Sequence, residues 1–295
     1  MTEPPAIDWA ARWRQARHSQ SWQGKSAADW NRRSAAFARR HLTSPFADRL
    51  LPLLPTQPDW TVLDIGCGPG TLALPLSPRV QRITAIDFSA SMLAILRRTA
   101  EEKSIGNIRT VEAGWDDPWP GVGAHDLVLA SRALAVDDIT AALDRIDRLA
   151  QRCAVIVERV GAGPFDPDIF AAVGRSFSPG PDYLYLVNLL YEMGIQASVA
   201  FIEPPATGGY ASEEEAYTSS AWMLEEMTGE EEQRLRLHLK ERLRPTATGL
   251  VLERRTPVRW AVLSWRRDGM ADRTGGPDRP PASSPPPPGP AGKPT

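Results

Sequence analysis

Two acidic residues stand at the ends of two short apolar runs, and a glycine-rich loop lies between them. Asp64 follows the run that begins at Val62, and Asp87 ends the run formed by residues 82–87. Each run has the length and composition of a buried strand, and ligands bind where the carboxyl ends of parallel strands meet. A carboxylate attracts a cationic group, and it also accepts hydrogen bonds from both hydroxyls of a cis-diol. Asp87 follows the loop by roughly 20 residues, the spacing at which an acid binds ribose in doubly wound folds, so the pair indicates a positively charged nucleoside.

The loop after Asp64 has a glycine at every second position: Gly66, Gly68 and Gly70. Glycine lets the backbone adopt positive φ and approach a ligand with no Cβ in the way. A dinucleotide-binding loop has the pattern G-x-G-x-x-G and faces a pyrophosphate. Here the third glycine comes one residue early, and Asp64 would repel a phosphate. The remaining alternative is a loop that only turns a strand into a helix.

Residues 63–71 resemble the first motif, D-x-G-x-G-x-G, of the class I S-adenosylmethionine-dependent methyltransferases. Residues 87–93 resemble the D-x-S-x-x-M-L stretch of the same family, whose apolar residues flank the adenine. The resemblance implies S-adenosylmethionine as the cofactor, because its ammonium and sulfonium suit an acid beside the loop. It assigns cofactor binding to Asp64, Gly66, Cys67, Gly68, Gly70, Asp87, Phe88 and Met92.

The loop after the third predicted strand resembles the family only in part. In the family this loop reads roughly G-D-A-x-x-L-P-F and recognises the adenine. Here Gly114 takes the place of the usual acid, Trp115 follows it, and Asp116 is expected to accept a hydrogen bond from the adenine amino group. The alternative is a polar loop whose tryptophans pack locally. Ser131, at the end of the fourth predicted strand, completes the predicted cofactor site.

Three residues are predicted to contact the substrate: Trp30, Arg132 and Glu158. Arg132 and Glu158 follow the fourth and fifth predicted strands, which places them at the same edge of the sheet as the acids. Glu158 could instead pair with a neighbour such as Arg159. Trp30 begins a segment, residues 30–37, that resembles the W-x-x-x-A-x-x-F/Y lid of small-molecule members of the family. The alternative for Trp30 is that it anchors a helix on the core.

The sequence identifies no catalytic residue. Transfer of a methyl group from a sulfonium depends mainly on holding the nucleophile close and in line. A general base is needed only if the nucleophile arrives protonated. The four histidines are predicted to lie away from the carboxyl ends of the strands, so no imidazole base is expected. They are His18, His41, His125 and His238.

Alternating strand-like and helix-like segments predict an α/β fold with a seven-stranded, mostly parallel, doubly wound sheet and helices on both faces. The predicted strands are residues 62–64, 82–87, 107–111, 125–131, 152–158, 196–202 and 256–265. The chain is predicted to divide into three regions. These are an N-terminal helical extension or lid (1–57), a class I methyltransferase domain (58–266) and a disordered Pro-rich tail (267–295). Residues 212–244 are predicted to form a helical insertion before the last strand, with acidic residues near its helix starts.

Composition narrows the class of partner. The 295 residues carry a net charge of −2, which favours a small-molecule substrate over nucleic acid or a membrane. Two cysteines imply neither a disulfide framework nor a metal cluster. No apolar run approaches 18 residues and no signal-peptide pattern is present, so a cytoplasmic location is expected. Two other functions stay open: methylation of a protein or other macromolecule, and a non-catalytic module that binds S-adenosylmethionine or S-adenosylhomocysteine. The oligomeric state is not indicated.

Overall fold

The computed structural model describes residues 7–22, 24–205, 209–224, 226–247 and 249–267. Its centre is a seven-stranded sheet with the strand order β3-β2-β1-β4-β5-β9-β6. The strands are β1 (Thr61–Ile65), β2 (Arg82–Asp87), β3 (Ile108–Glu112), β4 (His125–Ser131), β5 (Ala150–Arg159), β6 (Ser198–Ile202) and β9 (Trp260–Arg266). The first five strands pair in parallel, and β9 runs antiparallel between β5 and β6. The predicted fold class, an α/β fold with a mostly parallel sheet of seven strands, is confirmed.

The strand order reverses direction at the centre of the sheet. β2 and β3 lie on one side of β1, whereas β4 and β5 lie on the other. The helices that follow β1 and β4 therefore leave toward opposite faces, which opens a crevice at the carboxyl ends of these two strands. The candidate site lies at this crevice.

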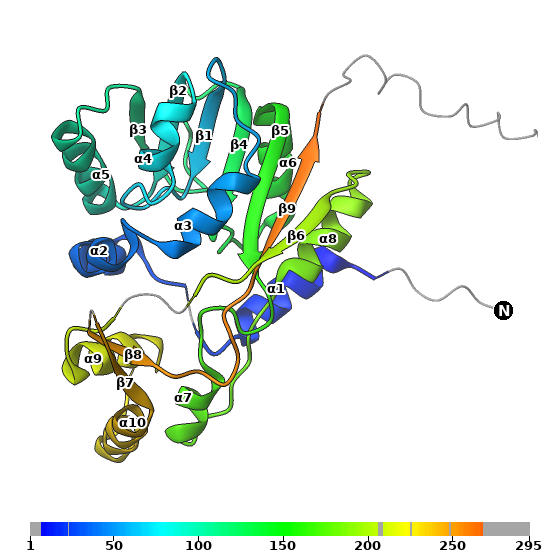
Figure 1. Cartoon of the computed structure of the whole chain (residues 1–295). Coiled ribbons are helices and arrows are strands. Elements are labelled where there is room, and N and C mark those ends of the chain that lie inside the picture. The colour runs from blue at the N-terminus through cyan, green and yellow to red at the C-terminus, as the bar shows by residue number, and fades with distance from the viewer. Residues whose placement is uncertain (1–6, 23, 206–208, 225, 248, 268–295) are drawn as a thin grey trace, which may run out of the picture.

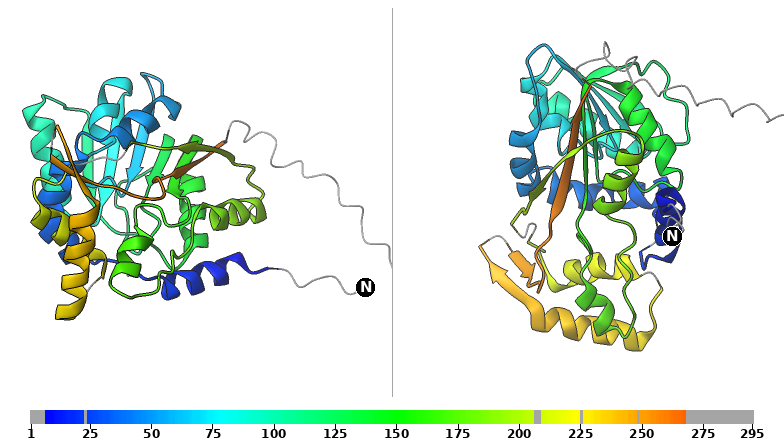
Figure 2. Two further views of the ribbon diagram at one scale, coloured as in Figure 1. Left: turned by 60° about the horizontal axis from the view of Figure 1, so that its bottom comes forward. Right: turned by 90° about the vertical axis from the view of Figure 1, so that its right-hand side faces the viewer.

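Two hydrophobic clusters cover the two faces of the sheet, and helices flank the sheet on both sides (Figure 2, right). Successive strand residues such as Val62 and Leu63 belong to different clusters, because side chains alternate along a strand. One face packs against α3 (Pro45–Leu50), α4 (Ala73–Leu76) and α5 (Ala90–Glu102). The other packs against α1 (Trp9–Ser19), α6 (Ile139–Leu149) and α8 (Tyr183–Glu192). Burial of both faces explains the nearly continuous apolar runs of the parallel strands.

The N-terminal helices pack in different places. α2 (Ala27–His41) begins with the predicted N-cap Ser26, which forms a capping box with Asp29, and it packs against α5. α1 packs against α8, and its residue Trp13 donates a hydrogen bond from Nε1 to the carbonyl of Val136 at 2.7 Å. The helices predicted in residues 1–57 are present, while their role as a lid stays a prediction.

A second group of elements forms a small lobe with its own hydrophobic cluster. It consists of α7 (Pro167–Ala172), α9 (Glu213–Leu224), α10 (Gly229–Arg242), β7 (Leu243–Thr246) and β8 (Gly249–Leu252). Figure 1 places it on the side of the sheet toward which β5 points. The small lobe therefore faces the carboxyl ends of the parallel strands.

The helical insertion before the last strand is confirmed, and a hairpin that was not expected follows it. α9 and α10 fall within the predicted residues 212–244, whereas the chain then forms the β7–β8 hairpin, which was not predicted. The last strand begins at Trp260 and not at residue 256. The predicted tail lies, from residue 268 onward, outside the described residues. Among the described helices, none is long and apolar enough to cross a membrane.

Candidate cofactor site

The three glycines of the loop after β1 serve different purposes. Gly66, Gly68 and Gly70 all have positive φ, at 68°, 56° and 92°. A Cβ on Gly66 would lie 2.5 Å from the Cβ of Ala133, and one on Gly70 would lie 2.4 Å from Cδ1 of Leu96. A Cβ on Gly68 would meet no atom within 4 Å. Gly66 and Gly70 therefore allow close packing, while Gly68 faces open space in which a ligand can approach the backbone.

Asp87 is buried, and the loop backbone holds its carboxylate in place. Oδ2 accepts a hydrogen bond from the Gly68 N–H at 2.8 Å, and Oδ1 accepts one from the Ser89 N–H at 2.8 Å. Burial raises the pKa of Asp87, and these two hydrogen bonds act in the opposite direction. Each oxygen retains lone pairs that can accept from further donors. Asp87 is thus a fixed acceptor directly beneath the glycine loop.

Asp64 is even more deeply buried and lacks such support. Its side chain is 2 % exposed, and within the described part of the chain its Oδ2 has no hydrogen-bond partner. Burial and the negative charge of Asp87 raise the pKa of Asp64 to about 7, while Arg132 lowers it. Burial and the two acids also raise the pKa of the Cys67 thiol, which keeps it protonated. A buried carboxylate oxygen without a partner is costly; binding of a cation by Asp64 stays a prediction.

Ser131 adds a second unpaired polar atom at the end of β4. Its hydroxyl is buried and has no hydrogen-bond partner among the described residues. β4 pairs directly with β1, with Ile65 beside Ala130. The two unpaired oxygens, on Asp64 and Ser131, therefore come from adjacent strands at the point where the strand order reverses.

The loop predicted to contact adenine is organised by Asp117 and not by Asp116. The Asp117 carboxylate accepts a hydrogen bond from the Gly114 N–H at 2.7 Å, whereas Asp116 is exposed. Trp115 donates from Nε1 to the carbonyl of Ala133, and Trp119 donates to that of Gly114. These contacts favour the alternative in which the tryptophans pack locally. Binding of adenine by Trp115 and Asp116 stays a prediction.

The two apolar residues predicted to flank adenine differ in exposure. Met92 is buried, with 3 % of its surface exposed, on the first turn of α5. Phe88 is 39 % exposed and precedes the same helix. Phe88 is therefore accessible to a ligand and Met92 is not, and contact of either residue with adenine stays a prediction.

Arg132 occupies a strained position directly after β4. Its φ is 58°, which is uncommon for a residue other than glycine, and its N–H donates to the carbonyl of Val157 at 2.8 Å. The guanidinium lies 4.3 Å from the ring centroid of Phe46 and 5.5 Å from that of Trp260. Burial lowers the pKa of Arg132 to about 10, while Glu158 and Asp64 raise it. Strained residues held by their surroundings are common at functional sites.

Glu158 lies at the end of β5, near the positive charges of Arg159 and Arg132. Its Oε1 accepts a hydrogen bond from the Arg159 N–H at 2.9 Å. Burial raises the pKa of Glu158, while Arg159 and Arg132 lower it. Arg132 therefore acts on both Asp64 and Glu158, and the structure brings together the acids and the arginine predicted from separate strands.

Two residues of α2 contribute to this region without any signal in the sequence. Asn31 accepts hydrogen bonds at Oδ1 from the Ser89 hydroxyl at 2.7 Å and from the Ser91 N–H at 3.2 Å. Burial, together with the positive charges of the nearby Arg132 and Arg40, lowers the pKa of the His41 imidazole to about 3. The prediction that no histidine lies near the strand ends is wrong for His41, because α2 folds back over the sheet edge.

Trp30, the third predicted substrate residue, packs against other aromatic rings. Its ring centroid lies 5.4 Å from that of Phe37 and 6.2 Å from that of Trp222 on α9. Trp30 therefore joins α2 to the small lobe. Contact with substrate stays a prediction.

Comparison with known proteins fits this geometry. Residues 62–152 match the family described as a methyltransferase domain. A Haemophilus influenzae protein of no assigned activity is 31% identical over 246 residues, which cover 81% of this chain and 89% of that protein. The chain belongs to the class I S-adenosylmethionine-dependent methyltransferases. S-adenosylmethionine is the methyl donor of this class.

Two further proteins resemble this methyltransferase. Nocamycin O-methyltransferase from Saccharothrix syringae is 32% identical over 109 residues, which cover 36% of this chain and 39% of that protein. A Bacillus halodurans protein assigned to the methyltransferases has a crystal structure that matches with a TM-score of 0.52 at 14% identity. That match covers 75% of this chain and 97% of the other. At this identity the structural match supports the fold of the methyltransferase and says nothing of its substrate.

Proposed function

We propose that the chain binds S-adenosylmethionine at the β1–β4 crevice and transfers its methyl group to a small molecule. The observation that carries this proposal is the unpaired, buried Asp64 carboxylate beside Asp87 and the open backbone of Gly68. A cation with a cis-diol satisfies both acids at once, whereas a phosphate at the same loop would be repelled by them.

The residues present fit the cofactor in chemical type. Asp64 would hold the ammonium of its amino-acid end, and Asp87, fixed by two backbone N–H groups, would accept from the ribose hydroxyls. Gly66, Cys67 and Gly70 shape the loop, and Gly68 lets it approach the ligand. The Ser131 hydroxyl supplies one more unpaired polar group at the end of β4. Binding of the adenine is assigned to Phe88, Met92, Trp115 and Asp116.

S-adenosylmethionine supplies a methyl group that is already activated on a sulfonium. The chain's own residues then have to hold the acceptor close, in line and away from water. Arg132 and Glu158 lie at the ends of the adjoining strands, and Arg132 can orient a polar acceptor. Among the groups near Arg132, Glu158 can receive a proton if the acceptor arrives protonated, whereas the lowered pKa of His41 makes its imidazole a poor proton acceptor.

Two observations favour a small molecule over a macromolecule as the acceptor. The net charge of −2 provides no broad basic surface for nucleic acid. The carboxyl ends of the strands also face α2 and the small lobe, which restrict access for a large substrate. Nocamycin O-methyltransferase, a partial relative, is named for a small-molecule product.

Calorimetry with S-adenosylmethionine and S-adenosylhomocysteine tests the cofactor site. Both ligands are expected to bind the wild-type chain, and Asp64→Asn and Asp87→Asn are expected to weaken both by roughly tenfold or more, because each removes a charged hydrogen-bond acceptor. Asp59→Asn is the matched control, since Asp59 is exposed just before β1. Absence of binding by the wild-type chain would refute the proposed function.

Turnover separates the enzyme from a non-catalytic module. A metabolite panel with a labelled methyl donor is expected to yield a labelled small molecule. Binding of the cofactor with transfer only to protein or nucleic acid fractions would contradict the small-molecule acceptor. Binding with no transfer to any fraction would favour the module.

A further inference from the structure

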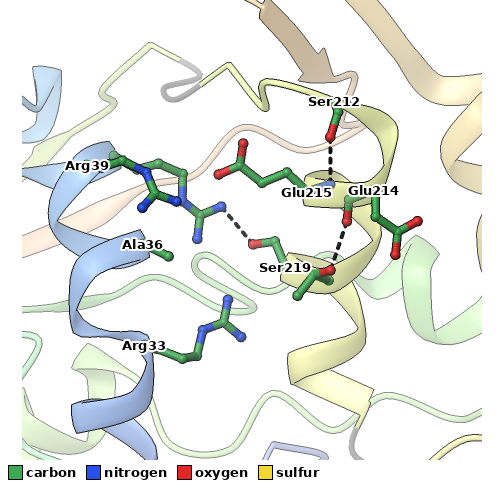
Figure 3. A pocket seen from close by; sticks show the side chains of 9 residues that line it. Arg33, Ala36, Arg39, Ser212, Glu214, Glu215 and Ser219 are labelled. Atoms are coloured by element: carbon green, nitrogen blue, oxygen red, sulfur yellow. Dashed lines mark hydrogen bonds between the residues drawn. The ribbon is translucent and has the colours of Figure 1, made fainter.

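A cavity of about 300 Å³ lies between α2 and α9, on the side of α2 that faces the small lobe. Figure 3 shows that arginines from α2 and acidic and hydroxyl side chains from α9 surround it. The arginines are Arg33, Arg39 and Arg40. The cavity lies outside the cofactor site described above, and no sequence motif indicated it.

The carboxylates that line this cavity are engaged elsewhere. Glu214 forms two hydrogen bonds with the guanidinium of Arg236, at 2.7 and 3.3 Å. Glu215 accepts a hydrogen bond from the Ala211 N–H at 2.8 Å, at the start of its own helix. Neither acid is within salt-bridge distance of an arginine of α2. Glu214 is therefore paired with a cation, and Glu215 is held by a backbone N–H of its own segment.

The arginines have no such compensation. Within the described residues, none of the three forms an ion pair with a carboxylate. Arg33 lies over the ring of Trp222, 4.2 Å from its centroid, and Arg40 donates to the Ser219 hydroxyl at 2.8 Å. The Nε of Arg40 is buried with no hydrogen-bond partner among the described residues. Burial, and to a lesser extent the charge of Arg40, lower the pKa of Arg33.

We infer that this cavity binds an anionic group, a carboxylate or a phosphate, carried by the methyl acceptor. Guanidinium groups present planar, paired donors that match the oxygens of both anions. The aromatic ring beneath Arg33 and the hydroxyl beside Arg40 hold the donors in place before the ligand arrives. The assignment to the acceptor rests on the proposed function.

The cavity adjoins the last turn of α2, where His41 follows Arg40. The charges of both Arg40 and Arg132 act on His41. An acceptor whose anionic group lies at Arg33 and Arg40 would have to reach around the end of α2 to approach Arg132 and the end of β4. Specificity for acids would in this way be set by α2 and the small lobe and not by the sheet.

Calorimetry of the full chain with inorganic phosphate and with succinate tests the anion site. At least one of the two is expected to bind, more weakly at high salt. Arg33→Gln and Arg40→Gln are each expected to weaken binding roughly ten- to a hundredfold, because each removes a charged donor. Arg32→Gln is the matched control, since Arg32 lies on the same helix but is exposed and pairs with Asp29. Unchanged affinity of all variants for S-adenosylhomocysteine verifies that they fold.

The anion site and the proposed function can be refuted independently of each other. Absence of binding of both anions, or equal weakening by Arg32→Gln, would overturn the anion site while leaving the cofactor site intact. No affinity of the wild-type chain for S-adenosylhomocysteine would instead refute the proposed function. For an acceptor found by turnover, the free acid is expected to have a KM at least tenfold below that of its amide, with the difference lost in Arg40→Gln. Equal KM values for acid and amide would overturn the link between the anion site and the acceptor.

Discussion

At the scale of single residues, Asp64 and Asp87 show that two identical side chains can differ in their hydrogen bonds because of their positions alone. Both are buried at the ends of neighbouring strands, and the sequence predicted both as ligand-binding acids. Only Asp87 has donors for both oxygens, because the loop places the N–H groups of Gly68 and Ser89 against it. Asp64 keeps an unpaired oxygen. Spacing could predict the acids, but their hydrogen bonds depend on loop conformation and could not be predicted.

The raised pKa of Asp64 makes cofactor binding depend on pH. The cation binds the ionised carboxylate, whereas the acid is largely protonated below its pKa of about 7. The dissociation constant for S-adenosylhomocysteine is therefore expected to rise by roughly tenfold or more between pH 7.5 and 5.5, with proton release on binding at the lower pH. Calorimetry in buffers of different ionisation enthalpy measures both the dissociation constant and the number of protons released on binding. Asp64→Asn should bind weakly with little dependence on pH, and a wild-type affinity that is constant over this range would contradict the role of Asp64.

Substitution of two glycines in the loop is expected to cause two separable defects, one in stability and one in cofactor affinity. Gly70→Ala places a Cβ 2.4 Å from Leu96 at a φ of 92°, so we expect a loss of about 1–3 kcal/mol in the free energy of unfolding. Gly68→Ala meets no neighbouring atom and should cost only about 1 kcal/mol for its left-handed φ. Its Cβ enters the open space over the loop, so cofactor affinity should fall. Denaturant unfolding measures the stability of the two variants, and calorimetry measures their affinity for the cofactor. Normal cofactor binding by Gly68→Ala would show that the loop does not face the ligand.

At the scale of elements, the strands were predicted more accurately than the segments beyond them. The parallel strands β1, β2, β4 and β5 read directly as buried apolar runs. The β7–β8 hairpin consists of two short strands, of which β7 is mostly exposed and β8 mostly half-buried, and neither has an alternating pattern that would reveal it. β9 begins later than predicted, after Pro257, because proline cannot donate to a sheet ladder.

α2 also shows a limit of prediction at this scale. Its start was predictable from Ser26, since capping is a local interaction. Its position over the site was not, because Asn31 and His41 act through residues far away in the chain. Contacts of this kind leave no periodic or local signal in a single sequence.

The contact between α2 and α5 predicts an effect on cofactor binding. Asn31→Leu removes the acceptor for the Ser89 hydroxyl and the Ser91 N–H, just after Asp87. We expect S-adenosylhomocysteine affinity to fall by roughly fivefold or more, which is the typical value of one lost hydrogen bond, because α2 is no longer held over the site. Asn188→Leu is the control, since that asparagine bonds only within α8. Equal affinities of the two variants would show that α2 does not contribute to the cofactor site.

At the scale of the whole molecule, the small lobe and the sheet are joined by chain connections and by a few side chains. The small lobe has its own apolar cluster, distinct from the two clusters that cover the sheet. Arg254, between β8 and β9, donates hydrogen bonds to the carbonyls of Gly163, Pro164 and Phe165 in the connection that leaves β5. This arginine therefore links the segment that leaves β5 for the small lobe with the segment that returns from the small lobe to β9.

Arg254→Ala is expected to lower the free energy of unfolding by about 2–3 kcal/mol, because it leaves partly buried carbonyls without their charged donor. Arg255→Ala removes only an exposed ion pair with Asp168 at 3.2 Å and should cost less than about 1 kcal/mol. Denaturant unfolding compares the two neighbouring arginines directly. Hydrogen exchange should then locate the effect of Arg254→Ala in the amides of α7, α9 and α10, with β1, β2 and β4 unchanged below global unfolding. Faster exchange throughout the sheet would instead mean that the small lobe and the sheet unfold as one unit.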